Sequence, residues 1–448
     1  MNILVVNGSP GGKESVTLQT VRLIQKHFKD QSFEVLNVAQ QIKAIEKNFT
    51  PARKAVEKAD ILLWAYPVYT FLVPSQLHRF MELLAEEGVD MQGKASMQIS
   101  TSMHFYDVTA HRFVKDFCGD CGMKYIGGLS AGMEDLLKIE GRKQAVAFFR
   151  HALWAYDNGL FEDITPTRSD VPRNMAQPKQ EKLATSIDHK IVIVADAKGN
   201  ERLQAMIQRF RFLLGSGVEV VELNDYPFVG GCLGCFHCAS EGKCIYKDGF
   251  DNFLREYIQG GEAIVYAFQI KNHSMGSLFK MFDDRQFCNG HRTVTMGKPM
   301  AYLIDGDLQG EENLKTLIEA RAQVGDNPLA GMIDDTGEVD QKIDLLAKNL
   351  VYCLENPMEM PQNFYGVGGM KIFRDLIYVM QGMMREDHRF YKKHGFYDFP
   401  QKNRMKVLAV YALGTLTRNE KFMKKNGLRM RQGMVMPYEA ILKKDEDL

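Results

Sequence analysis

The sequence predicts an α/β protein built from two tandem, doubly wound parallel sheets and a helical C-terminal extension. Three observations indicate this fold class: strands alternate with amphipathic helices, the pattern occurs twice, and it ends near residue 340. Alternation of this kind favours parallel strands joined by right-handed helical crossovers. The chain has 448 residues, enough for roughly two to four domains that each have a core.

The repeat appears as matching segments at a long and nearly constant offset. Residues 3–6 and 191–194 are short apolar runs, typical of buried parallel strands, and they lie 188 positions apart. Residues 59–65 match residues 261–267 at an offset of 202, which continues to the pair Ser75 and Ser277. The offset grows between these landmarks because the second copy holds an inserted segment with clustered cysteines.

Strand-like and helix-like segments can be assigned in order along the first copy. We expect five strands, near residues 2–6, 33–38, 60–65, 95–101 and 124–128. We expect helices near residues 16–29, 51–58, 75–86, 107–121 and 138–157. Five strands in a domain of this length fit a flavodoxin-like, five-stranded sheet better than a barrel.

The domain boundaries follow from these patterns. We expect a first domain over residues 1–164 and a degenerate second domain over residues 190–339. Residues 165–189 contain three prolines and many polar residues, which is typical of a linker. Residues 340–448 are predicted to form a helical, Met-rich extension with a turn at 363–369 and helices near 371–385 and 403–416.

Composition and charge exclude several classes of protein. The chain has 56 basic and 56 acidic residues, a balance that argues against a protein that coats nucleic acid. No apolar run reaches the roughly 18 residues of a transmembrane helix, and the N-terminus has no signal-peptide pattern. Eight cysteines are too few for a disulfide scaffold. We therefore expect a cytoplasmic protein with no transmembrane segment and no nucleic-acid partner.

The zero net charge hides an uneven distribution. Residues 358–448 contain 17 Lys and Arg against 10 Asp and Glu, so the remaining chain is acidic by the same amount. A basic extension would steer an acidic electron-transfer protein toward it. A membrane surface and ordinary packing of the methionines are the alternatives that the sequence leaves open.

Three loops of the first copy follow strands whose carboxyl ends meet at one edge of the predicted sheet. Residues 8–17 are rich in glycine and hydroxyl groups and precede a helix, which suits a phosphate monoester. An ordinary strand–helix turn with Ser15 or Thr17 as the N-cap is the alternative. Residues 66–70 and 100–106 carry aromatic and polar groups that either enclose a planar ring or lie on the surface.

These loops resemble those of the flavodoxin-like NAD(P)H-dependent FMN reductases. The resemblance rests on Gly8-Ser9-Pro10 with Ser15 and Thr17, on Pro67-Val68-Tyr69, and on Ser75-Gln76-Leu77-His78-Arg79-Phe80. It implies bound FMN in the first copy and NAD(P)H as the reductant. Val16, His78, Glu82 and Leu83 depart from the family pattern.

The resemblance also implies which residues bind the cofactor. They are Ser9, Pro10, Ser15 and Thr17 at the phosphate, and Pro67, Val68, Tyr69, Thr70, Thr101, Ser102, His104 and Tyr106 around the flavin ring. We expect Tyr69, Ser102 and His104 to lie at the reactive edges of the ring and to serve as the catalytic residues.

The second copy lacks these loops and carries a cysteine motif. Residues 196–202 have no Gly-Ser-Pro pattern, so we expect no second FMN bound in the same manner. The second copy gains four cysteines within thirteen residues, Cys232, Cys235, Cys238 and Cys244. Thiolates at this spacing suit a [4Fe–4S] cluster or zinc. The motif resembles that of the iron–sulfur flavoproteins, which implies a [4Fe–4S] cluster on these four residues; cluster-free thiols remain an alternative.

Our leading hypothesis is an FMN-dependent NAD(P)H oxidoreductase that passes hydride or electrons to a small-molecule or quinone-like acceptor, coupled to the cluster if one is present. An iron–sulfur flavoprotein that carries electrons from ferredoxin is the second hypothesis. A non-enzymatic redox sensor or partner-binding protein is the third. Relatives are commonly dimeric, so either a homodimer forms or the second copy takes the place of a partner subunit.

Overall fold

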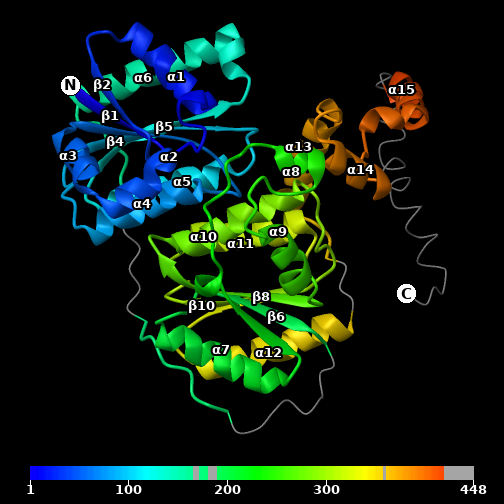
Figure 1. Ribbon diagram of the computed structural model, residues 1–448. Helices are drawn as coiled ribbons and strands as arrows, with labels where there is room; N and C mark the ends of the chain where they lie inside the picture. Colours follow the sequence, from blue (N-terminus) through cyan, green and yellow to red (C-terminus); the bar gives the residue numbers. More distant parts are fainter. Residues whose placement is uncertain (165–170, 180–188, 357–359, 418–448) are drawn as a thin grey trace. The chain divides into compact units, whose positions relative to one another are not determined.

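The computed structural model describes residues 1–164, 171–179, 189–356 and 360–417. The chain divides into two compact units, residues 1–390 and residues 391–448. Both predicted sheets lie in the first unit, and each is covered by helices on its two faces (Figure 1). The predicted α/β class with two flavodoxin-like parallel sheets is therefore confirmed. No helix in the described ranges is long and apolar enough to cross a membrane.

The first sheet has the order β2-β1-β3-β4-β5, and all of its strands are parallel. Its strands are β1 (Asn2–Asn7), β2 (Ser32–Leu36), β3 (Ile61–Pro67), β4 (Ala95–Ser102) and β5 (Lys124–Gly132). Its helices are α1 (Val16–His27), α2 (Val38–Lys47), α3 (Thr50–Lys58), α4 (Ser75–Glu86), α5 (Asp107–Asp120) and α6 (Ile139–Asp157). All the predicted elements are present, but α2 was not predicted. It begins directly after Asn37, a favoured N-cap residue, but the side-chain oxygen of Asn37 accepts a hydrogen bond from Asn7 (2.9 Å) and makes no cap bond.

The second sheet repeats this order as β7-β6-β8-β10-β11. Its parallel strands are β6 (Ile191–Ala195), β7 (Val218–Glu222), β8 (Ala263–Lys271), β10 (Met300–Asp305) and β11 (Leu329–Asp334). Its helices are α7 (Glu201–Leu214), α8 (His237–Glu241), α9 (Phe250–Phe253), α10 (Ser277–Arg285), α11 (Glu312–Gly325) and α12 (Val339–Glu355). The prediction of five strands needs one correction, because the short strand β9 (Ser274–Met275) pairs with β8 in an antiparallel hairpin.

The helical extension begins later than the sequence predicted. The boundary near residue 340 would exclude α12, yet Ile343, Leu346 and Leu350 of this helix are buried in the core of the second sheet. The helices that follow are α13 (Phe364–Val379), α14 (Arg385–Lys393) and α15 (Arg404–Thr417). The predicted turn at 363–369 is instead the start of α13, where the Asn363 side chain accepts a hydrogen bond from the Tyr365 amide.

The described part of the predicted linker lies against the second domain. Ala176 is buried in the core of that domain, and the amide of Gln177 donates to Asp340 (2.9 Å). Arg173 forms ion pairs with Asp305 and Asp335 at the ends of β10 and β11. Residues 171–179 are therefore packed structure, while residues 165–170 and 180–188 lie outside the described residues.

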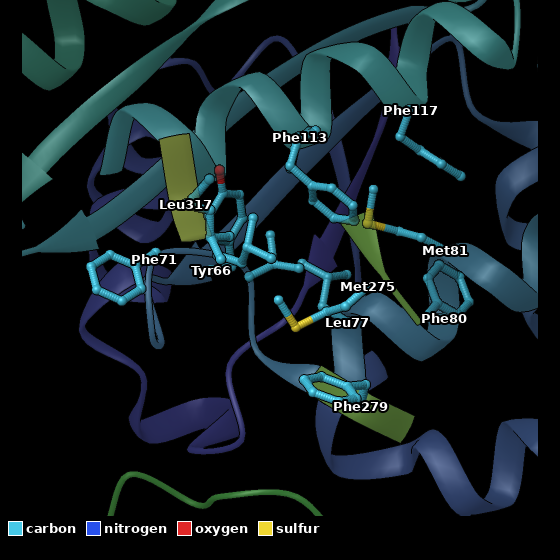
Figure 2. Close-up of a cluster of buried hydrophobic side chains, with 14 of the residues drawn as sticks. Tyr66, Phe71, Leu77, Phe80, Met81, Phe113, Phe117, Met275, Phe279 and Leu317 are labelled. Atoms are coloured by element: carbon cyan, nitrogen blue, oxygen red, sulfur yellow. The ribbon is translucent and has the colours of Figure 1, made fainter. Parts of the chain in front are cut away.

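The two domains share one hydrophobic core. A single cluster of buried side chains includes Tyr66, Leu77 and Phe113 of the first domain together with Phe279 and Leu317 of the second. Figure 2 shows these side chains gathered around α4 and α5. Burial of apolar area contributes roughly 25 cal/mol per Å², so this shared cluster binds the domains together strongly.

The helices α4 and α10 cap each other across the domain boundary. Neither helix has a cap bond from a side chain at its own N-cap position. The first amide of α4, on Ser75, donates to Asp284 (2.8 Å), and the first amide of α10, on Ser277, donates to Glu82 (2.6 Å). Both pairs are related by the offset of 202. Each carboxylate therefore neutralises the positive end of the other domain's helix.

The turns that precede α4 and α10 share the same unusual backbone conformation. Thr70 and Phe71 have positive φ angles of 43° and 69°, and so do Asn272 and His273, at 49° and 63°. The two pairs are again 202 positions apart. Positive φ is costly for a residue with a side chain. The same strained turn therefore occupies the same place in both copies.

His273, one of these residues with positive φ, forms ion pairs that link the two domains. Its Nε2 lies 2.9 Å from Asp120 at the end of α5, and its Nδ1 lies 3.0 Å from Glu311. Hydrogen bonds to these two carboxylates raise the pKa of His273 to about 10. The imidazole is therefore charged at neutral pH, and it links the first domain to the start of α11.

Breaking the buried ion pair between Lys280 and Asp284 should destabilise the folded protein strongly. Both side chains are fully buried, and they form an ion pair one helical turn apart. Asp284→Ala should cost about 3–5 kcal/mol of unfolding free energy, because it strands the Lys280 ammonium. Chemical denaturation measures this loss. Glu86→Ala, which removes an exposed carboxylate of the same helix pair, should cost about 1 kcal/mol or less. Equal costs for the two variants would contradict the assignment.

His273 predicts a pH dependence of stability with a definite sign. Its pKa is higher in the folded protein than the ordinary value of 6.5. The added stability is fully present below about pH 6.5 and is lost as the pH rises through about 10. The difference in Tm between the natural protein and His273→Gln should therefore be largest near pH 6 and shrink toward pH 10. His151→Gln, at an exposed position of α6, should show no such trend. A difference that grows with pH would contradict the ion pairs.

Candidate functional site

Three loops of the first domain meet at the carboxyl edge of its sheet, as predicted from the sequence. They follow β1, β3 and β4, which are neighbours in the strand order. The amide of Gly8 donates to the carbonyl of Ala65 (2.8 Å), and the amide of Val68 donates to the carbonyl of Thr101 (3.1 Å). These bonds tie each loop to the next, so residues far apart in the sequence meet at the sheet edge where open α/β folds bind ligands.

The first loop ends in a capped helix start. The Ser15 hydroxyl accepts a hydrogen bond from the Leu18 amide (3.3 Å) and is the N-cap of α1. The Ser9 hydroxyl accepts from the Gly11 amide (3.3 Å). Ser9 and Pro10 are buried beside it. Gly8 is required here, because a β-carbon at this position would lie 2.4 Å from Leu77 of α4.

Thr17 has the feature that fits a missing ligand group. It lies in the first turn of α1, is 1% exposed, and its hydroxyl has no hydrogen-bond partner among the described residues. The first turn of α1 contains no acidic residue, so the helix end remains positive. An unpaired buried hydroxyl beside free helix amides suits a phosphate group.

The second loop is a tight turn after β3. The Tyr69 amide donates to the Leu72 carbonyl (2.8 Å) and the Leu72 amide returns a bond of 3.0 Å. Thr70 and Phe71 stand at the centre, where positive φ at both positions is the pattern of a type I′ turn. Pro67 ends β3, and Val68 leads into the turn. Burial raises the pKa of Tyr69 well above its usual range, so the phenol stays protonated.

The third loop holds a hydrogen-bonded group of polar side chains. The Ser102 hydroxyl accepts from the His104 amide (2.8 Å), and His104 Nδ1 lies 3.2 Å from Asp107. Burial opposes ionisation of Asp107, but hydrogen bonds from Ser130 and His104 outweigh it and lower its pKa. Thr101 is buried, and its hydroxyl has no partner among the described residues. The His104 side chain itself remains 57% exposed.

Two of the predicted residues have other partners. The Thr70 hydroxyl donates to Asp284 of the second domain (3.4 Å). Tyr106 packs against Phe71, with ring centroids 4.7 Å apart, and against Tyr365 of α13 at 6.0 Å. These contacts give both residues a role in joining the domains.

A lysine of the second domain holds the turn after β3 in place, a contact that sequence reasoning missed. The Lys280 ammonium donates to the carbonyl of Tyr69 (2.8 Å). Lys280 and Asp284 correspond to His78 and Glu82 by the offset of 202. Comparing the copies at these positions would have found this signal, since the lysine and aspartate absent from the first copy are present in the second.

The cysteine loop of the second domain lies against the same turn. The Gln76 side chain donates to the carbonyl of Cys232 (3.2 Å). A β-carbon on Gly234 would lie 1.9 Å from the Tyr69 hydroxyl oxygen. The first-domain turn and the cysteine loop are therefore in direct contact, and glycine permits the approach.

The four thiols are close neighbours but do not form a ligand set as they stand. All are free, and within the described ranges no group of three or more His, Cys, Asp or Glu side chains is arranged to hold a metal ion. Burial raises the pKa of Cys238 to about 11 and that of Cys232 further still, and charge on the neighbouring cysteines adds to both shifts. The donor chemistry fits a cluster, whereas the present arrangement keeps these two thiols protonated.

The corresponding edge of the second sheet is occupied by the chain itself. The Arg173 guanidinium donates to Asp335 (2.9 and 3.0 Å) and also bonds Asp305. Asn200 donates to Asp305 (2.8 Å) from the loop that corresponds to the first loop of domain one. At this sheet edge the second domain therefore has carboxylates paired with an arginine, where the first domain has hydroxyl groups.

Comparison with known proteins finds a family match in the first domain. Residues 1–134 match the family model described as NADPH-dependent FMN reductase, so the resemblance predicted from the three loops is confirmed for the first domain. An iron–sulfur flavoprotein of Clostridioides difficile (strain 630) is 23% identical over an alignment of 150 residues that covers 29% of this chain. The match spans 61% of that relative's length.

Solved structures similar to this chain each cover about one domain of it. The apo form of an NADH:FMN oxidoreductase (EMOB) is 18% identical, with 34% of this chain and 89% of that chain covered and a TM-score of 0.31. An FMN-dependent NADH-azoreductase from Bacillus anthracis, in complex with FMN, is 15% identical, with 36% and 99% covered and a TM-score of 0.27.

Proposed function

We propose that the protein is an FMN-dependent oxidoreductase that uses NAD(P)H and carries one FMN at the crevice of its first domain. The observation that carries the proposal is the unpaired Thr17 hydroxyl in the first turn of α1, within a segment that matches the FMN reductases. Bound FMN would supply hydride and electron transfer, which no side chain can supply. Activity with NADH or NADPH and a quinone-like acceptor is part of this proposal.

In this proposal the first loop holds the phosphate and the other two hold the ring. Ser9, Ser15 and Thr17 would bind the phosphate with helix amides of α1. The turn at Pro67–Thr70 would support one side of the ring, and Lys280 keeps that turn in place through the Tyr69 carbonyl (2.8 Å). Tyr69, Ser102 and His104 would contact the edges of the ring.

His104 is suited to exchange a proton with solvent in this site. Its Nδ1 lies 3.2 Å from Asp107 and 3.3 Å from the Ser130 hydroxyl, so the ring is held in orientation. More than half of the side chain is exposed. An imidazole that is oriented by a carboxylate and open to water can deliver a proton to a reduced acceptor.

The test compares two equivalent changes on one helix. Thr17→Val should weaken FMN binding about tenfold or more, because a hydroxyl bond to a charged phosphate contributes roughly 1.5–3 kcal/mol. Thr20→Val makes the same change one turn further along α1, at an equally buried position, and should leave FMN affinity within about twofold. Titration of flavin fluorescence measures both. Equal affinity of both variants, or no FMN binding by the natural protein, would contradict the proposal.

The electron donor separates the proposal from its alternative. In an NAD(P)H oxidoreductase, NADPH or NADH should bleach the flavin absorption band rapidly under anaerobic conditions. In an electron carrier of the iron–sulfur flavoprotein type, reduced ferredoxin should do so and the nicotinamides should not. A protein that binds FMN but accepts electrons from neither would favour the redox-sensing alternative.

We further propose that Cys232, Cys235, Cys238 and Cys244 hold a [4Fe–4S] cluster beside the flavin turn. The support is the spacing of the four thiols and the contact between Gly234 and Tyr69. Cluster assembly would release the thiol protons. Anaerobically purified protein should contain iron and sulfide in equal amounts. Cys235→Ser should abolish both, and Cys121→Ser, outside the motif, should retain them. Iron-free protein prepared without oxygen would contradict the cluster.

A further inference from the structure

We propose that a cavity beside the Tyr69–Leu72 turn binds a single aromatic ring that carries a hydroxyl or carbonyl oxygen, as in a phenol. The cavity lies between the first domain's loops, α11, α13 and residues 286–295 of the second domain. The proposal goes beyond the FMN site, because none of its steps requires bound FMN.

The volume of the cavity fits one six-membered ring. It measures about 150 Å³. An engineered protein cavity of roughly this volume, lined by apolar side chains, stays dry and binds benzene. The cavity is partly open to solvent, so a ligand can extend beyond the ring that it holds. The enclosed part therefore takes one six-membered ring.

The walls are formed by aromatic side chains in contact with one another. Phe71 lies 5.2 Å from Phe105, and Phe105 lies 4.5 Å from Phe373, measured between ring centroids. Phe373 lies 4.7 Å from His291, which lies 6.0 Å from Phe287. All five rings line the cavity. Aromatic rings favour tilted and edge-to-face partners at these distances, so these walls suit a further aromatic ring.

Asn289 supplies the polar recognition. It lines the cavity and is 6% exposed. Its carbonyl accepts from Arg292, but its side-chain amide makes no hydrogen bond within the described part of the chain. Because Asn289 is a lining residue, its side-chain amide is available to a ligand in the cavity. An amide donates and accepts, which suits a ring hydroxyl or a ring carbonyl.

The charges around the cavity favour a neutral ligand. Arg321 forms an ion pair with Asp283 (2.6 Å). Arg292 donates to the carbonyl of Cys288 (3.3 Å) and lies 3.8 Å from Glu386. Both cations are therefore already engaged with protein groups. A carboxylate on the ligand would have to displace one of these partners, whereas a phenol meets the free amide without doing so.

The test measures the binding of phenol and toluene to the full-length protein by isothermal titration calorimetry. Asn289→Leu should weaken phenol about tenfold, the value of one hydrogen bond, and leave toluene within about twofold. Val294→Trp, at a cavity-lining residue that is 40% exposed, should abolish binding of both. Val220→Trp, at an equally exposed valine of β7, should change neither.

The outcomes separate this site from the FMN site. Thr17→Val should bind phenol as the natural protein does, so a failure of the flavin proposal leaves this result unchanged. Failure of the natural protein to bind phenol would overturn the inference. So would an Asn289→Leu variant that weakens phenol and toluene equally, or a Val294→Trp variant that binds both normally.

Discussion

The structure depends on a reciprocal bond between two helices. The carboxylate of Asp284 accepts the first amide of α4, and the carboxylate of Glu82 accepts the first amide of α10. Each helix thus has its first amide bonded by the other domain. Because the loop after β3 leads directly into α4, the position of α10 determines where that loop lies. The shared core around Leu77 and Phe279 then fixes the pair in place.

The two copies share the same backbone turn but differ in the side chains around it. The strained turn recurs at Thr70–Phe71 and Asn272–His273. The first turn is bonded by a lysine of the other domain, whereas the equivalent position of the first domain is a histidine. Lys280 holds the Tyr69 carbonyl, whereas the equivalent His78 is buried with neither ring nitrogen paired within the described ranges. Burial lowers the pKa of His78 to about 4, so it stays neutral. The first copy therefore carries the three loops at its sheet edge, whereas the second copy supports one of them and has Arg173 paired with carboxylates at its own edge.

Much of this could be predicted from the sequence, because strand periodicity and glycine–hydroxyl loops are local signals. Both sheets and the three loops follow from such signals, and α12 was separated from its domain only because helices after the last strand look alike. Lys280 and Asp284 act across a distance of about 200 residues, and only a comparison of the two copies at that offset reveals them. The Arg173 ion pairs and the aromatic cavity depend on tertiary contacts that no local pattern encodes. Thr70 and Tyr106, which the resemblance implied as cofactor-binding residues, also make contacts outside the first domain that no local pattern encodes.

The central claim is that one domain binds flavin and its duplicate has become the supporting partner. The amount of FMN bound per chain tests this most directly, measured by equilibrium dialysis of the full-length protein with saturating FMN. We expect one FMN per chain. Two per chain would mean that the second crevice still binds flavin despite Arg173, and none would mean that the first crevice is not a flavin site.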